Sequence, residues 1–95
     1  MDIIKTTAKV FDFNPYDITC KSRKWRSVAA RQIIAFISYE FGYDIITISG
    51  LINRHRTDIY NCLNQAIVRI EYDELFKEFY KSVLTKLISK DYEFK

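Results

Sequence analysis

Apolar residues recur at three- and four-residue intervals over the last quarter of the chain. Between residues 73 and 90 the pattern comprises Leu75, Phe76, Phe79, Tyr80, Val83, Leu84, Leu87 and Ile88. This period matches one face of an α-helix, so it predicts a C-terminal helix over about 73–90 with one buried side. The chain has only two glycines and one proline, whereas a β-rich fold with many tight turns needs more. Both observations favour an all-α protein.

The N-terminal half has the same period. We expect a first helix over 3–13 and then a short helix that starts at Pro15, because proline suits the first turn of a helix. A third, strongly apolar helix is expected from Ser27, a candidate N-cap, to about Gly42, a residue type that often ends helices. The length suits one domain and is too short for two, so 1–95 is predicted to be a single helical domain.

A helix-turn-helix is expected in the middle of the chain, over about 44–70. Residues 44–52 are rich in β-branched side chains, which are common in strands. A lone strand in a helical chain would leave its backbone N–H and C=O groups without partners, so we expect a short helix. A turn at 53–56 and a long helix from Thr57 complete the motif, in a domain of five or six helices. The residues that the long helix is expected to bury are Ile59, Tyr60, Leu63, Ala66, Ile67 and Ile70.

Positive charge is concentrated in two places. Residues 21–31 carry five Lys or Arg side chains and no acid, and Arg54-His55-Arg56 precedes the predicted long helix. The net charge of the whole chain is only +3, so it is the clustering that indicates a polyanionic partner. Residues 20–26, the basic segment, are expected to form a loop. Double-stranded DNA is the predicted partner, and a solvated basic loop is the alternative.

Two sets of side chains have the chemistry that duplex DNA requires. Cations of the basic segment suit phosphates or a narrow minor groove, and they are Lys21, Arg23, Lys24 and Arg26. Side chains near the start of the long helix suit base edges in the major groove, and they are Arg54, His55, Arg56, Thr57, Asp58 and Asn61, with Gln65 one turn further.

Alternatives remain open for several of these residues. Arg31, on the third helix, either reaches a phosphate or covers apolar surface with its stem. Thr57 and Asp58 either contact bases or cap the helix. Trp25 either stacks near the DNA or packs its ring over the third helix, and we favour packing.

The sequence carries no motif for catalysis or metal binding. Gly42 and Gly50 are the only glycines, so a glycine-rich phosphate loop cannot be built. His55 is the only histidine, and Cys20 and Cys62 are far apart, so neither a catalytic triad nor a zinc site is indicated. We expect no enzyme activity, cofactor or metal. Without a long apolar run or an apolar leader, we expect a cytoplasmic protein and no membrane association.

A longer motif extends from the basic segment into the third helix. It reads Lys21-Ser22-Arg23-Lys24, then Val28, then Ala30-Arg31-Gln32-Ile33 with Ala35-Phe36. This motif resembles the start of the DNA-binding domain of the bacterial replication initiator DnaA. The upstream element 13–18 and the helix element 45–49 are also similar, so the resemblance covers about 3–70. It implies a Trp-repressor-like helix-turn-helix that binds replication origins, with Arg23 in the minor groove and Arg31 on a phosphate.

The recognition signature of that family is Gly-Gly-Arg-Asp-His-Thr-Thr-Val. Against it, Arg54 stands at the arginine, His55 at the aspartate, Arg56 at the histidine and Thr57 at the first threonine. Both glycines are missing, and Asp58 replaces the second threonine. The resemblance therefore implies a DNA reader whose base contacts differ from those of the family, without the nucleotide-binding module of the initiator.

The wide apolar stripe of the C-terminal helix allows two further interpretations. A homodimer through this helix would suit a reader of two half-sites. Alternatively, the chain is a protein-interaction module that docks another replication protein through the same helix. An RNA-binding variant also stays open, because cationic side chains attract both nucleic acids.

Overall fold

The computed structural model describes residues 3–12, 14, 16–19 and 24–93, and all the regular structure among them is helical. The helices are α1 (Ile3–Phe11), α2 (Tyr16–Thr19), α3 (Trp25–Glu40), α4 (Ile45–Ile52), α5 (Arg56–Tyr72) and α6 (Glu74–Glu93). The predicted all-α class is confirmed, and so is the choice of helix over strand for residues 45–52.

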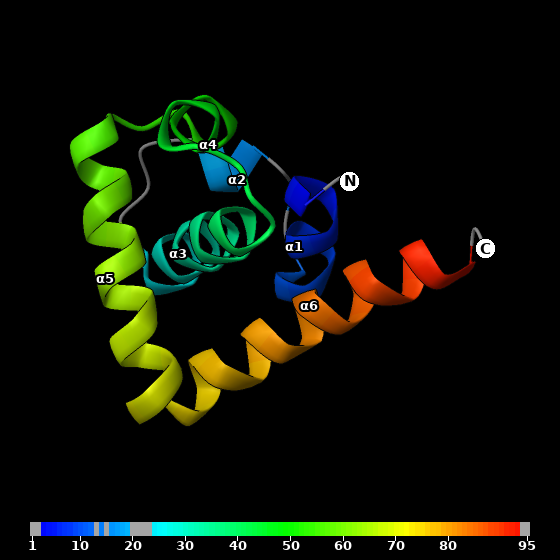
Figure 1. Ribbon diagram of the computed structural model, residues 1–95. Coiled ribbons are helices and arrows are strands. Elements are labelled where there is room, and N and C mark those ends of the chain that lie inside the picture. The colour runs from blue at the N-terminus through cyan, green and yellow to red at the C-terminus, as the bar shows by residue number, and fades with distance from the viewer. Residues whose placement is uncertain (1–2, 13, 15, 20–23, 94–95) are drawn as a thin grey trace.

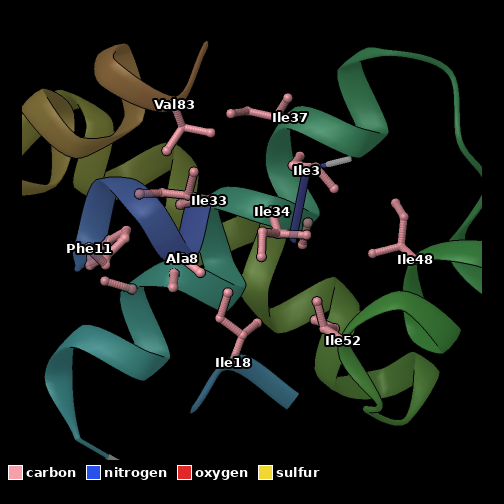
Figure 2. Close-up of a cluster of buried hydrophobic side chains, with 14 of the residues drawn as sticks. Ile3, Ala8, Phe11, Ile18, Ile33, Ile34, Ile37, Ile48, Ile52 and Val83 are labelled. Carbon is pink, nitrogen blue, oxygen red and sulfur yellow. The ribbon is translucent and has the colours of Figure 1, made fainter. Parts of the chain in front are cut away.

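Helix α3 lies at the centre of the molecule, with the other helices around it (Figure 1). Ten of its 16 residues are buried, so it is enclosed on nearly all sides. Figure 2 shows Ile33, Ile34 and Ile37 of α3 among apolar side chains from α1, α2, α4 and α6. One continuous hydrophobic core therefore packs the first helix, α1, and the last helix, α6, against α3.

The end of α3 lies close to the predicted position. Gly42 has a φ of 95°, a left-handed conformation that favours glycine. Its N–H donates to the carbonyl of Tyr39 (3.1 Å), and the N–H of Tyr43 donates to the carbonyl of Ser38 (3.0 Å). These two bonds satisfy carbonyls that the helix end leaves open, which is the Schellman arrangement.

The start of α3 differs from the prediction. The helix begins at Trp25, and Lys24 is its N-cap without a capping side-chain hydrogen bond. Ser27 is buried inside the helix and does not cap it. The Trp25 ring lies 6.2 Å from the Phe79 ring of α6, so tertiary packing extends the helix beyond the position that capping preference indicated.

Asp44 caps the N-terminus of α4. Its Oδ1 accepts a hydrogen bond from the backbone N–H of Thr47 (2.7 Å). Hydrogen bonds from the Thr47 side chain and then from its backbone hold the pKa of the Asp44 carboxyl below its ordinary value of 3.8. Both bonds stabilise the ionised form, because the carboxylate is the better acceptor.

The lowered pKa of Asp44 predicts an acid-sensitive part of the stability. The folded-state pKa lies below the unfolded value of 3.8, so this stabilisation is complete above that pH and is lost as pH falls through the folded pKa. We expect the free energy of unfolding to decline more steeply below pH 3.8 in the native chain than in Asp44→Asn. Urea titrations at pH values from roughly 2 to 6, a range that brackets the ordinary pKa of an aspartate, measure this difference by circular dichroism. Parallel curves for the two proteins would contradict it.

Helices α5 and α6 bury fewer of their apolar residues than predicted. On α5, Ile59 and Ala66 are buried, but the side chains of Tyr60 and Ile67 are 56% and 54% exposed. On α6, Leu75 is about half exposed as well. The expected burial of Tyr60 and Ile67 was therefore wrong, because α5 meets α3 along a line narrower than its apolar face.

Candidate nucleic-acid interface

Helices α4 and α5 are joined by a three-residue turn, Asn53 to His55. Asn53 adopts a left-handed conformation (φ 54°) that reverses the chain direction after α4. The N–H of Arg54 donates to the carbonyl of Ser49 (3.1 Å), and the Ser49 hydroxyl donates to the carbonyl of Arg54. Below the turn, Ile52 and Ile59 are buried in the common core. Hydrogen bonds and packing therefore hold the start of α5 in a defined position.

The first turn of α5 presents polar side chains to solvent. His55 is the N-cap, and its Nδ1 accepts a hydrogen bond from the backbone N–H of Thr57 (3.2 Å). The helix therefore begins at Arg56, one residue earlier than predicted, and Thr57 does not cap it. The exposed side chains of this end are His55, Arg56, Thr57, Asp58 and Asn61.

Thr57 and Asn61 lie one turn apart on the same face of α5. At 100° per residue this face is opposite Ile59, whose side chain is fully buried. Asp58 lies in the first turn, where the positive end of the helix dipole favours an acid. The exposed face therefore carries a hydroxyl and an amide, and in the first turn Arg56 and Asp58 flank it, each about 100° around the helix from Thr57.

Arg54 connects the turn to α2. Its side chain is half buried, and its NH1 donates to the carbonyls of Asn53 (2.9 Å) and Thr19 (3.4 Å). Thr19 is the last residue of α2 and directly precedes the basic segment 20–26. The guanidinium predicted to contact DNA thus already contacts two backbone carbonyls, and it joins the end of α2 to the α4–α5 turn.

The basic segment is only partly described. Lys21 and Arg23 lie outside the described residues, so their predicted roles stay predictions. Lys24 is exposed at the N-cap of α3. Trp25 and Arg26 belong to the first turn of α3, which corrects the prediction that residues 20–26 are all loop.

Phe79 of α6 supports these first residues of α3. The Arg26 guanidinium carbon lies 5.9 Å from the centre of the Phe79 ring, a cation–π distance. Trp25 also approaches this ring, so the tryptophan packs on α6 and not over α3 as expected. Phe79 also stacks on the ring of Phe11, with 4.1 Å between the ring centres. The sequence marked Phe79 only as a core residue, and its link to Arg26 depends on the packing of α6 against α3.

Two predicted DNA contacts are directed into the protein. Arg31 is 6% exposed, and its NH1 donates to the carbonyl of Ile18 in α2 (3.1 Å). The Oε1 atom of Gln65 accepts a hydrogen bond from Nε2 of the buried Gln32 (2.5 Å). Arg31 therefore joins α2 to α3, and Gln65 joins α5 to α3. This corrects the interpretation of Arg31 as a phosphate contact and of Gln65 as a base reader.

The described part of the chain contains one cysteine, Cys62, and no cluster of metal-ligating side chains. Burial raises the pKa of the half-buried Cys62 thiol, which disfavours the thiolate that a nucleophile requires. Within the described ranges, no three His, Cys, Asp or Glu side chains gather as a metal site. Nor is any described helix both long and apolar enough to cross a bilayer.

No protein-family model matches this sequence, and no curated protein is significantly similar to it. A function must therefore be inferred from the residues of the chain itself.

Proposed function

We propose that this chain binds duplex DNA sequence-specifically, with the first turn of α5 in the major groove. One observation carries the proposal. A three-residue turn fixes α5 against α4, and the exposed end of α5 carries Arg56, Thr57 and Asn61. The N-terminal residues of the second helix of a helix-turn-helix are those that reach base edges. Asparagine pairs with adenine and the threonine methyl contacts thymine, and Arg56, in the first turn beside them, is placed to bind a flanking phosphate.

The basic segment is the proposed source of phosphate contacts. Arg54 binds the carbonyl of Thr19, the residue that directly precedes this segment in the sequence. The segment supplies Lys21, Arg23 and Lys24, and Arg26 follows in α3 with its guanidinium on Phe79. Cations near a recognition helix position it on the duplex without reading sequence. The positive end of the α5 helix dipole favours the same anions.

The resemblance to the DNA-binding domain of DnaA supports a role at replication origins. The proposal differs from the family pattern in its recognition residues. Arg54, at the position of the family arginine, is half buried and binds backbone carbonyls, whereas Arg56 and Thr57 are exposed. The preferred site is therefore proposed to differ from that of the family.

Replacing Arg56 by alanine is expected to weaken duplex binding and to lower the salt dependence. Loss of one phosphate contact reduces the slope of log Kd against log salt by about 1. Lys81→Ala is the matched control, because Lys81 is an exposed cation of α6 away from the α4–α5 turn. Fluorescence anisotropy at several salt concentrations, with a duplex selected from a random library, measures the affinity and its salt dependence for each variant. Equal losses for Lys81→Ala and Arg56→Ala, or no binding to any duplex at low salt, would contradict the proposal.

Replacing Thr57 by alanine is expected to change which sequence is preferred. A lost base contact costs about 1–3 kcal/mol at one position of the site and little at the others. Repeating the library selection with the variant shows whether one position relaxes. A duplex RNA of equal length should bind more weakly, because its major groove does not admit a helix. Equal affinity for both polymers would favour the RNA-binding alternative.

A further inference from the structure

An apolar groove of about 510 Å³ lies between the end of α3, the start of α4 and the middle of α5. Its apolar lining consists of Phe36, Tyr39, Ile45, Tyr60, Leu63 and Ile67. The polar lining residues are Glu40 and Asn64. The proposed DNA contacts at the start of α5 are not among these residues.

The groove accounts for the exposure of Tyr60 and Ile67, which the helical period predicted to be buried. These two residues and Tyr39 line the groove, and each is more than half exposed. Large apolar side chains gathered around a hollow mark an interaction site, whereas single exposed ones do not. The apolar face of α5 is thus wider than α3 can cover, and its uncovered part borders the groove.

The exposed apolar surface continues beyond the groove. Ile46 follows the lining residue Ile45 in α4 and is 66% exposed, and Val68 follows the lining residue Ile67 in α5 and is 55% exposed. Tyr60 and Ile67 are seven residues apart, about 10 Å along the helix axis at 1.5 Å per residue. A surface of this length suits the i and i+7 positions of a helix lying in a groove.

Glu40 gives the groove its charge. Among the described lining residues it is the only Asp, Glu, Lys, Arg or His. The Tyr80 hydroxyl donates to Glu40 Oε1 (3.0 Å), which orients the carboxylate. Burial and then this carboxylate raise the pKa of Tyr80 to about 12, so its hydroxyl stays a donor at neutral pH. An oriented carboxylate beside the aromatic residues Phe36 and Tyr39 matches a cationic side chain.

We propose that this groove docks an amphipathic helix of a partner protein, with a Lys or Arg of that helix at Glu40 and its apolar residues between Tyr60 and Ile67. The two surfaces are separate. The start of α5 serves DNA, and its middle, with the end of α3, serves the partner. Docking on the groove does not depend on DNA binding.

Selection from a displayed library of helical peptides, with the purified chain as target, tests the proposal. Enriched peptides are expected to carry apolar residues at i, i+3 or i+4, and i+7, together with a Lys or Arg. Anisotropy of an enriched, labelled peptide should show no binding to Ile67→Glu and about tenfold weaker binding to Glu40→Gln, roughly what one desolvated cation contact contributes. Leu75→Glu is the control, because it adds an acid at an exposed apolar position of α6 outside the groove.

Several outcomes would overturn the proposal. These are no enriched peptide, enrichment of acidic peptides, and binding that survives Ile67→Glu. If circular dichroism shows that Ile67→Glu is unfolded, Tyr39→Glu takes its place, because Tyr39 lines the same groove and is equally exposed. Sedimentation equilibrium tests whether the chain self-associates. If it does, and if Ile67→Glu abolishes the self-association, the occupant of the groove is a second copy of this chain. The groove variants are expected to bind DNA with unchanged affinity. A failure of peptide docking is therefore distinguishable from a failure of the proposed DNA binding.

Discussion

Replacing Phe11 by alanine is expected to lower the free energy of unfolding by about 3–5 kcal/mol, the usual cost of a phenylalanine cavity. The Phe11 side chain is fully buried, and its ring stacks on Phe79 at 4.1 Å with an interplanar angle of 13°. This pair connects α1 to α6, the first helix to the last. Because a domain of this size is stable by only about 5–15 kcal/mol, the loss is a large part of the total.

Urea unfolding followed by circular dichroism measures the effect of Phe11→Ala. Tyr72→Ala is the control, since it removes an aromatic ring that is 79% exposed and is expected to cost less than about 0.5 kcal/mol. Phe79 also contacts Trp25 and carries the Arg26 guanidinium. Phe11→Ala should therefore weaken DNA binding even where the variant is still folded. Equal stability of the two variants would show that the α1–α6 contact is not part of the core.

Replacing Arg31 by alanine is expected to destabilise the fold by about 1.5–3 kcal/mol, the range for a buried hydrogen bond with a charged donor. The substitution leaves the Ile18 carbonyl without the NH1 donor that it has in the structure. Because the Arg31 side chain is only 6% exposed, the salt dependence of DNA binding is expected to stay unchanged. This combination distinguishes a link between α2 and α3 from a phosphate contact.

Urea unfolding and salt titrations of duplex binding, at a temperature where Arg31→Ala is folded, give the two readouts. Arg31→Lys should recover only part of the stability, because an ammonium lacks the planar fork of the guanidinium. Arg56→Ala provides the opposite pattern, with a lower salt slope and little loss of stability, since its side chain is exposed. A stable Arg31→Ala with a slope reduced by about 1 would restore Arg31 as a phosphate contact.

The helices themselves were largely predictable from the sequence. The periodicity located the C-terminal helix within a few residues, and the glycine at position 42 marked the end of α3. The start of α3 was missed because Trp25 packs on Phe79, which is distant in sequence. Local capping preferences are worth about 1 kcal/mol, and an aromatic pair contributes a similar amount, about 0.5–1.5 kcal/mol, although Trp25 stays 38% exposed.

By itself, the sequence determined the all-α class and the order of the helices, and it predicted a turn at 53–56 where the structure has one at 53–55. Only the tertiary structure decided which face of each helix is covered. It buries Arg31, binds the exposed Gln65 to the buried Gln32, and leaves Tyr60 and Ile67 exposed beside a groove. The reason is physical. A period of 3.6 shows which residues share a face, but whether another helix covers that face depends on contacts between segments far apart in the chain.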